Sequence, residues 1–243
     1  MAAAAGAGLT PGPLALVGSG EYLPVMAEIE AGLLVGRPQR YVQIPTAAAP
    51  EGPATLARWV ALGIAQADRL GVTAVPLRVE SRADAQDPAV AERVRGAGLI
   101  YLSGGNPPFL ADTLRGTLLW EAIFAAWQDG AALAGCSAGA MALTDWVPDI
   151  RQAGAPGRRG LGAVPHLRVI PHFDRMTQWL PDLPERYLLD LPPGTEVVGI
   201  DEDTALVGGP HEWVVQGRQS AWRITPAGRH EHPPGSVLVT AGA

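Results

Sequence analysis

The pentapeptide Gly135-Cys136-Ser137-Ala138-Gly139 is the segment of this sequence best suited to chemistry, because it fits the pattern G-x-S-x-G. It follows a short run of small apolar residues, 131–134, and precedes a stretch that favours a helix, 138–143. In such an elbow the serine sits on a strained turn, and its hydroxyl is exposed above the edge of a sheet. The N–H of Ala138 would then point at a developing oxyanion. The pattern favours Ser137 as a nucleophile, although the same residues would also suit a tight strand-helix joint.

A serine hydroxyl needs a base within hydrogen-bond reach, and the sequence contains five histidines. His172 follows the predicted strand 167–170 after Pro171, so it should lie at the C-terminal edge of that strand. His166 precedes that run and should lie at the opposite end. The other three are in the polar terminal region, where exposure to solvent is the default: His211, His230 and His232. We expect His172 to be the base, although a partly buried histidine bonded to backbone could occupy the same position.

An imidazole base needs a carboxylate to hold its tautomer and to stabilise its cation. Three acids, Asp201, Glu202 and Asp203, follow the short apolar run 197–200 and precede the apolar residues 204–207. Clustered acids are normally solvated, but this apolar bracket favours a site. The chain order would then be Ser, His, acid, whereas α/β-hydrolases have the order Ser, acid, His.

The elements that must position these residues alternate between short apolar runs and longer amphipathic stretches, which is typical of helices packed on a mainly parallel sheet. Helical spacing is clearest at 54–70, where Gly71 supplies a stop signal. The predicted strands are 14–17, 41–44, 72–79, 98–102, 131–134 and 167–170. The predicted helices are 23–34, 54–70, 90–95, 108–114, 118–129 and 138–143. The predicted class is therefore α/β, with a mainly parallel sheet between layers of helices.

The C-terminal half has a less regular pattern. Residues 148–162 contain proline, glycine and three arginines without periodicity, which predicts a long loop. Residues 173–189 predict a helix that is interrupted by Pro181 and Pro184. Residues 196–239 predict short strands with Gly and Pro turns, arranged as an antiparallel edge or as a small terminal sheet.

No internal repeat or low-complexity linker divides the chain, so we expect one domain over 1–243. Residues 1–13 should form a flexible N-terminal tail, and the last 45 residues or so could form a lobe of their own. The beginning of the chain lacks the positively charged region of a signal peptide, and no run approaches the ~18 apolar residues of a membrane span. We expect a cytoplasmic protein that does not bind membranes. The sequence does not decide between a monomer and a homodimer.

Composition excludes several classes of function. The chain is 47% hydrophobic with a net charge of -6, and its 18 basic residues are all arginine, because it contains no lysine. This excludes Schiff-base, pyridoxal and P-loop chemistry. An acidic chain with isolated arginines also lacks the electrostatic footprint of a nucleic-acid binder. Cys136 is the only cysteine, so a disulfide framework and a cysteine-built metal site are excluded. We expect a small peptide or other small molecule as partner, and neither a cofactor nor a metal.

Several separated segments resemble the cyanophycinase and aspartyl dipeptidase (peptidase E) family of serine peptidases. The segments are Gly-Cys-Ser-Ala-Gly-Ala from Gly135, Pro-His-Phe-Asp from Pro171, Gly-Ile-Asp-Glu-Asp-Thr-Ala-Leu from Gly199, Val-Gly-Ser-Gly-Glu from Val17 and Leu-Ser-Gly-Gly-Asn from Leu102. The resemblance implies a class I glutamine-amidotransferase-like, flavodoxin-like fold. It also implies that Ser137 is the nucleophile, His172 the base and Glu202 the acid, with the amides of Gly105 and Ala138 in the oxyanion hole.

The resemblance also implies candidates for substrate binding, namely Asn106, Arg175 and Arg186. This sequence departs from the cyanophycinase pattern at two places. It has Asn106-Pro107-Pro108 where that pattern has a glutamine, and it has only Arg175 close to the histidine where that pattern has several arginines. The aspartyl dipeptidase branch holds a substrate carboxylate with a later arginine, for which Arg186 is in about the right region. That branch takes its acid from between nucleophile and histidine, where Asp145 or Asp149 could serve.

The leading hypothesis is therefore a serine exopeptidase that hydrolyses short, acidic (Asp-X type) peptides through an acyl-enzyme. One alternative is a class I amidotransferase-like protein that is not a peptidase, and another is a cyanophycinase-type hydrolase of aspartyl-arginine peptides. Amidotransferases use a cysteine at the elbow, whereas here the cysteine comes one position earlier. A cofactor binder that uses Gly18-Ser19-Gly20 as a phosphate turn is a third class, but the pattern lacks its third glycine.

Overall fold

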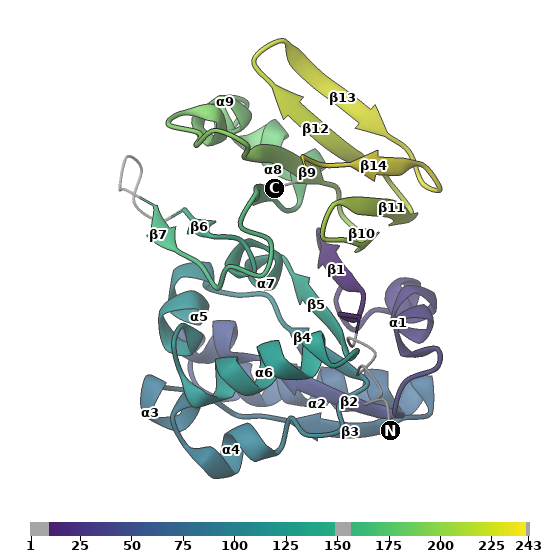
Figure 1. Cartoon of the computed structure of the whole chain (residues 1–243), viewed down its shortest axis with the longest axis vertical. Coiled ribbons are helices and arrows are strands. Elements are labelled where there is room, and N and C mark those ends of the chain that lie inside the picture. Colours follow the sequence, from purple (N-terminus) through teal and green to yellow (C-terminus); the bar gives the residue numbers. More distant parts are fainter. Residues whose placement is uncertain (1–9, 149–156, 242–243) are drawn as a thin grey trace, which may run out of the picture.

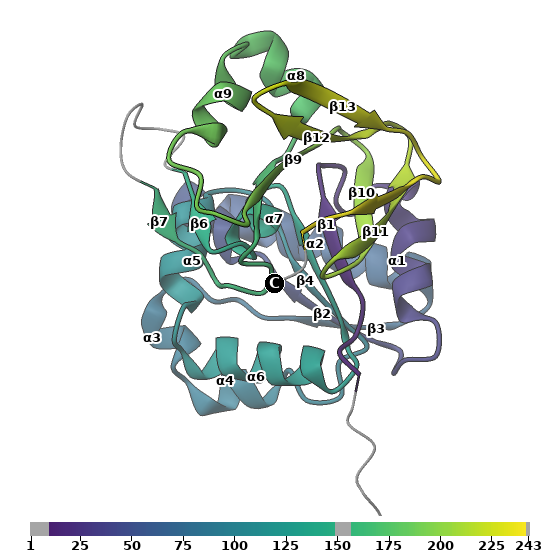
Figure 2. The same ribbon diagram turned by 45° about the horizontal axis from the view of Figure 1, so that its top comes forward.

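The computed structural model describes residues 10–148 and 157–241, and Figures 1 and 2 show two sheets surrounded by helices. Within these residues the larger sheet has eight strands. In spatial order they are β14 (Val237–Val239), β11 (Glu212–Gly217), β10 (Thr204–Gly208), β1 (Leu14–Val17), β5 (Ala132–Cys136), β4 (Leu99–Leu102), β2 (Arg40–Ile44) and β3 (Thr73–Pro76). The five strands from β1 to β3 are parallel, and the other three are antiparallel. The predicted α/β class is confirmed, including its antiparallel C-terminal strands.

Both faces of the parallel strands are buried, which is why their sequences are nearly continuous apolar runs. On β1, Leu14 and Leu16 pack into the core on one face, whereas Ala15 and Val17 pack into the core on the other. The first face is covered by α3 (Arg82–Ala85), α4 (Pro88–Glu92), α5 (Pro107–Leu114), α6 (Leu118–Gln128) and α7 (Ala138–Ala142). The second is covered by α1 (Ala27–Leu34), which follows the 3₁₀ turn η1 (Pro24–Met26), and by α2 (Pro53–Leu70).

The smaller sheet lies above the main sheet in Figure 1. Its strand order is β13 (Gly228–His232), β12 (Ala221–Thr225), β9 (Glu196–Ile200) and β8 (Leu167–Ile170). Strands β8 and β9 are parallel and the other two pairs are antiparallel. Helices α8 (Phe173–Trp179) and α9 (Leu183–Leu188) pack on this sheet through Phe173, Leu183 and Tyr187. The predicted interruption of this helical stretch is confirmed.

The C-terminal strands do not form a sheet of their own. β10 pairs with β1, and β11 and β14 extend the main sheet from β10. β12 and β13 instead join β9 in the smaller sheet. The last part of the chain is therefore divided between the two sheets. Pairing with β1 places β10 in the main sheet, and pairing with β9 places β12 in the smaller sheet; the local sequence pattern does not specify either partner.

Several predicted elements differ from those observed. The loop predicted at 148–162 contains β7 (Arg158–Arg159), which pairs antiparallel with β6 (Trp146–Val147), while residues 149–156 lie outside the described residues. Helix α3 and the 3₁₀ segment η2 (Thr46–Glu51) were not predicted. The third strand ends at Pro76 instead of residue 79. These short elements depend on tertiary contacts, because neither their length nor their periodicity distinguishes them from loops.

The residues that precede β1 are held against α6. Of the tail predicted at 1–13, residues 1–9 lie outside the described residues. Gly12 donates its N–H to the carbonyl of Trp127 and accepts the indole N–H of the same residue, both at close range (2.9 and 2.8 Å). The part of the predicted tail that lies directly before β1 is thus held in place by α6.

Among the described helices, none is long and apolar enough to cross a membrane.

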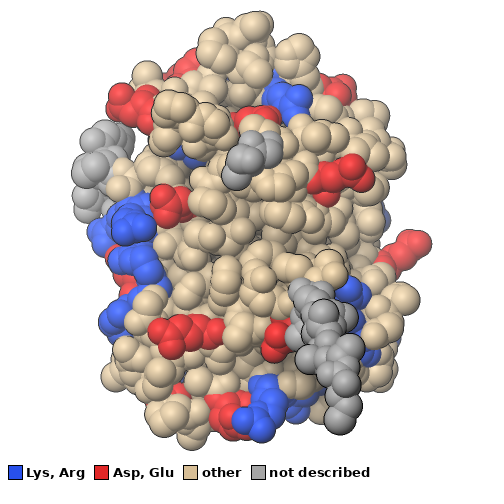
Figure 3. Space-filling model, in the orientation of Figure 1, with Lys and Arg blue, Asp and Glu red and all other residues tan. Residues whose placement is uncertain are grey.

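Figure 3 shows one face of the surface, which is mostly uncharged. Arginines gather on one edge of this face, over α5 and β7. Arg115 and Arg158 both form ion pairs with Asp112 there, at 2.9 and 2.7 Å. The basic groups of this edge are therefore partly neutralised by a carboxylate.

Candidate active site

The carboxyl ends of β1, β5 and β4 meet at one edge of the main sheet. Val17 pairs with Cys136, and Leu102 pairs with Gly135, so the chain leaves all three strands at the same level. Loops that follow adjacent parallel strands commonly form the sites of open α/β sheets. The next residue after β5 is Ser137, as the elbow pattern predicts.

Ser137 has the strained backbone expected of an elbow. Its φ and ψ angles are 49° and -106°, and positive φ is uncommon for residues other than glycine. The strain is held by the surrounding structure, because Ser137 donates its N–H to the carbonyl of Val17 at 2.9 Å. A Cβ on Gly139 would lie 2.2 Å from the carbonyl oxygen of Leu102. The second glycine of the pattern is therefore required for α7 to pack against β4.

Two backbone N–H groups lie beside Ser137 without an acceptor among the described residues. The N–H of Ala138 is the first of α7, where helix geometry leaves it unbonded. Gly105 has a φ of 135°, and a Cβ on it would lie 2.4 Å from the carbonyl oxygen of Ala47. Ser137, Gly105 and Ala138 border one small cavity. This arrangement suits the binding of a negatively charged oxygen.

His172 follows β8 at the edge that faces Ser137. Its φ and ψ angles of 48° and 38° are left-handed, so the chain turns sharply before α8 begins. Its Nε2 lies 3.0 Å from the Oγ of Ser137. Its Nδ1 lies 3.2 Å from the Oε1 of Glu202. If Nδ1–H donates to the carboxylate, Nε2 is the nitrogen left to accept the serine proton.

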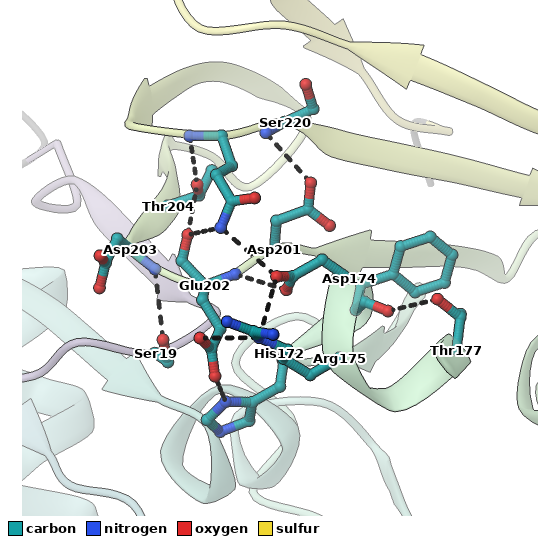
Figure 4. Close-up of polar contacts among 12 residues, drawn as sticks. Ser19, His172, Asp174, Arg175, Thr177, Asp201, Glu202, Asp203, Thr204 and Ser220 are labelled. Carbon is teal, nitrogen blue, oxygen red and sulfur yellow. Dashed lines mark hydrogen bonds and ion pairs between the residues drawn. The ribbon is translucent and has the colours of Figure 1, made fainter. Parts of the chain in front are cut away.

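Glu202 lies in the loop after β9, the parallel neighbour of β8. Figure 4 shows its carboxylate reaching toward His172. Its backbone is held on both sides: the N–H donates to Asp174 at 2.9 Å, and the carbonyl accepts from the side chain of Gln219 at 3.0 Å. Asp203, the next residue, donates its N–H to the hydroxyl of Ser19 at 3.2 Å. The acid loop is therefore attached to α8, to the loop between β11 and β12, and to the turn after β1.

Asp201 and Asp145, the other acids considered from the sequence that the structure describes, have no hydrogen bond or ion pair with His172. Asp201 is 5% exposed and accepts hydrogen bonds from the indole of Trp222 and the N–H of Ser220. Burial raises the pKa of Asp201, and the bond from Trp222 opposes that shift. Asp145 lies 4.0 Å from Arg159, and Asp149 lies outside the described residues. Of the described candidates, Glu202 is the acid beside the imidazole.

The predicted substrate-binding residues do not converge. Asn106 caps α5, because its side-chain oxygen accepts the N–H of Phe109 at 3.0 Å. Arg175 lies behind the acid, with its Nε 3.5 Å from the Oε2 of Glu202. Arg186 forms an ion pair with Asp182 on its own helix, at 2.7 Å. No described contact links either arginine to Ser137.

Glu21, in the turn after β1, is a residue whose role the sequence analysis missed. Its carboxylate accepts the N–H of Gly104 and the thiol of Cys136, each at 2.9 Å. The first bond fixes the Ser103–Gly104 peptide, which is adjacent to the peptide that carries the N–H of Gly105. The Gly-Ser-Gly-Glu sequence was the available signal, but it does not indicate which loop the carboxylate reaches.

Cys136 is fully buried behind the elbow. Burial raises the pKa of its thiol well above the ordinary value, and the neighbouring Glu21 carboxylate adds to that effect. The thiol is therefore neutral and donates to Glu21. A nucleophilic thiolate, as amidotransferases use, is not formed at this position.

Within the described residues, no cluster of three or more His, Cys, Asp and Glu is arranged to hold a metal ion. The site instead consists of a serine, an imidazole and a carboxylate in hydrogen-bond series, beside two unbonded N–H groups. On the carboxyl edge of an α/β sheet, this arrangement defines a serine hydrolase type of site.

The family model of peptidase family S51 matches residues 14–212 of the chain. The match covers more than half of the chain, which therefore belongs to peptidase family S51 and is a serine peptidase. Both the peptidase E and the cyanophycinase enzymes are grouped in this family, so the resemblance seen in the sequence is confirmed. Among curated proteins, none matches this chain significantly.

Two solved structures are similar to this chain. The crystal structure of a peptidase from an acI-B1 Actinobacterium has a TM-score of 0.87 and 43% identity, covering 96% of this chain and 98% of that one. A crystal structure from Listeria monocytogenes EGD-e, provisionally assigned to a peptidase E protein, has a TM-score of 0.64 and 20% identity, covering 86% of this chain and 100% of that one. At this low identity the second likeness supports the fold alone.

Proposed function

We propose that this serine peptidase cleaves short peptides through an acyl-enzyme formed on Ser137, with His172 as base and Glu202 as acid. The observation that carries this proposal is the series of two hydrogen bonds, 3.0 Å from Ser137 Oγ to His172 Nε2 and 3.2 Å from His172 Nδ1 to Glu202 Oε1. Both distances are within hydrogen-bond reach. At the first, a proton can pass from the Ser137 hydroxyl to the imidazole.

The reaction follows from these positions. The Oγ of Ser137 attacks the scissile carbonyl carbon while its proton passes to Nε2 of His172. The carbonyl oxygen becomes negative and accepts hydrogen bonds from the N–H groups of Gly105 and Ala138. The C–N bond then breaks, and the imidazolium gives its proton to the leaving amine. Water repeats these steps with His172 as base, which releases the acid product and restores the serine.

Glu202 supports the charged intermediate of each step. When His172 holds two protons, its positive charge faces the carboxylate at Nδ1, so the imidazolium is stabilised relative to water. The side chains of His172 and Glu202 are each about one third exposed, at 34%. The pair is therefore accessible to a small substrate while being held by the backbone bonds of Glu202.

The acidic substrate expected from the sequence requires a cation beside the scissile bond. The two arginines suggested for this role are paired with carboxylates of the chain itself, Arg175 with Glu202 and Asp174, and Arg186 with Asp182. The contacts of these two arginines do not support the acidic preference expected from the sequence, so the proposed function concerns the reaction alone.

The test is hydrolysis of a dipeptide library, followed by mass spectrometry, by the wild type and the variant Ser137→Ala. We expect the substitution to reduce turnover by about 10⁴-fold or more, because it removes the covalent step, with an unchanged circular dichroism spectrum. The matched control is Cys136→Ala, the adjacent position, which should retain activity because the thiol is buried and neutral. Turnover of Ser137→Ala within tenfold of wild type would contradict the proposal, as would loss of activity in folded Cys136→Ala.

A further inference from the structure

A small cavity of about 60 Å³ opens beside the Oγ of Ser137. Its walls come from the oxyanion loop at Gly105, from Met141 on α7, and from Ile170 at the end of β8. Met176 of α8 and the α9 residues Leu183 and Tyr187 close the far side. A site next to the nucleophile is where one side chain of the substrate must lie during attack.

The described lining of this cavity is apolar apart from the catalytic groups and the hydroxyl of Tyr187. Thioether, aliphatic and aromatic side chains form its walls, and the described lining includes no arginine. Burial raises the pKa of the Tyr187 phenol, so this ring is neutral. The nearest imidazole, that of His172, is bonded to Ser137 and Glu202.

Arg168, a cation that contacts the cavity-lining residue Tyr187, is bonded to backbone carbonyls. Arg168 is 4% exposed, and its guanidinium donates to the carbonyls of Tyr187, Leu189 and Asp190 at 2.8 to 2.9 Å. It also lies over the ring of Trp146, with Cζ 4.3 Å from the centroid. Because three carbonyls hold it at the end of α9, Arg168 stabilises the wall of the cavity and is not available to a substrate carboxylate.

The N–H groups of Gly105 and Ala138 are occupied by the acyl carbonyl oxygen during attack, so a side-chain carboxylate in this cavity would lose its hydration without a cation to replace it, which disfavours its binding. An aliphatic side chain would instead remove apolar surface from water on both sides. The volume corresponds to about four or five water-sized groups, which is the size of a Val or Leu side chain.

We propose that the cavity binds a branched aliphatic side chain on the acyl side of the scissile bond, so that the enzyme prefers Val or Leu over Asp at this position. The acyl side is assigned because Gly105 and Ala138, the residues that would bind the acyl carbonyl oxygen, line the same cavity. This inference rests on the proposed function and adds the class of substrate to it.

The first test uses Leu-Ala, Asn-Ala and Asp-Ala, whose first side chains share a branch point at Cγ and nearly the same shape. The reversed set, Ala-Leu, Ala-Asn and Ala-Asp, is measured in parallel. We expect kcat/KM to fall from Leu through Asn to Asp in the first set, by about 100-fold overall, and to vary little in the second.

The second test places a cation in the cavity wall. Met176 is half-buried on α8 and lines the cavity, whereas Gln178 is exposed on the same helix and does not. We expect Met176→Arg to raise the Asp-Ala to Leu-Ala ratio of kcat/KM by at least about tenfold. Gln178→Arg adds the same charge two residues away and should leave the ratio unchanged. If Met176→Arg does not fold, Met176→Ala should shift the preference from Val-Ala toward Leu-Ala by enlarging the cavity.

The results separate this inference from the proposed function. Wild-type cleavage of Asp-Ala as fast as Leu-Ala, with Ser137→Ala inactive, would overturn the inference and leave the reaction standing. Dependence on the second residue instead of the first would overturn the acyl-side assignment. A lack of hydrolysis in both sets would overturn both proposals.

Discussion

At the scale of single residues, the contact between Glu202 and His172 decides among acids that the sequence could not rank. Asp201, one residue earlier, is turned toward Ser220 and Trp222, as Figure 4 shows for Ser220. Glu202 begins the turn that follows β9, and the turn directs its side chain away from that of Asp201. A one-residue difference in the loop therefore separates an acid that can act on the imidazole from one that stabilises the smaller sheet.

We predict that Glu202→Gln lowers kcat by about 10² to 10⁴-fold and changes KM little, because an amide does not stabilise the imidazolium and can favour the wrong tautomer. Steady-state kinetics on the best dipeptide would measure this. Asp145→Asn is the matched control, since Asp145 lies 4.0 Å from Arg159 and has no described contact with His172. A silent Glu202→Gln together with an inactive Asp145→Asn would assign the acid to the segment between nucleophile and histidine.

At the scale of elements, the turn after β1 connects parts of the site that lie far apart in the sequence. Ser19 accepts the N–H of Asp203 in the acid loop, and Glu21 accepts the N–H of Gly104 in the oxyanion loop. A Cβ on Gly20 would lie 2.6 Å from a carboxylate oxygen of Asp203. The glycines of this turn thus allow close packing against the acid loop, which accounts for them without a bound phosphate.

We predict that Glu21→Ala lowers kcat by about 10 to 100-fold with little change in KM, since the Ser103–Gly104 peptide would lose its acceptor and the adjacent N–H of Gly105 would shift. Glu21→Gln keeps an oxygen for Gly104 and should restore most of the activity. Glu28→Ala, at an exposed position of α1, serves as the control. Equal losses in Glu21→Gln and Glu21→Ala would show that the negative charge matters and that positioning of Gly104 does not.

At the scale of the whole molecule, a buried acid couples stability to pH. Glu30 of α1 is 1% exposed and accepts the hydroxyl of Tyr41 at 3.0 Å. Burial raises the pKa of Glu30 from 4.5 to about 7. The folded chain therefore holds a proton that the unfolded chain loses above its lower pKa. The free energy of unfolding must fall as pH rises from about 4.5 to 7, and this contribution is complete only below that window.

We predict that Glu30→Gln removes this dependence and is more stable than wild type at pH 8, by up to about 3 kcal/mol. The two proteins should be nearly equal at pH 4.5. Urea unfolding at pH 4.5, 6 and 8 measures the difference, with Glu28→Gln on the same helix as control. The same decline with pH in wild type and Glu30→Gln would show that other groups cause it.

Local sequence determined much of this protein. Strands β1, β4 and β5 are short, fully buried apolar runs, and the helices between them have helical periodicity or clear stop signals such as Gly71. β8 is fully buried and apolar except for Arg168. The Ser137 elbow and the position of His172 after β8 were also predictable, because each depends on residues next to one another in the chain. The start of α3 also has a local signal, the Ser81-x-x-Asp84 capping box, although a helix of four residues is too short to be assigned from periodicity.

Only the tertiary structure decided which groups meet. The division of the C-terminal strands between two sheets depends on partners far away in the sequence, such as β1 for β10. The same is true of Glu21 at Gly104, whereas the ion pair of Arg186 joins it to Asp182, four residues earlier. A side chain's type and its neighbours in sequence set what chemistry it can do. Its partner depends on packing, because hydrogen bonds and ion pairs act over a few ångströms in space whatever the separation along the chain.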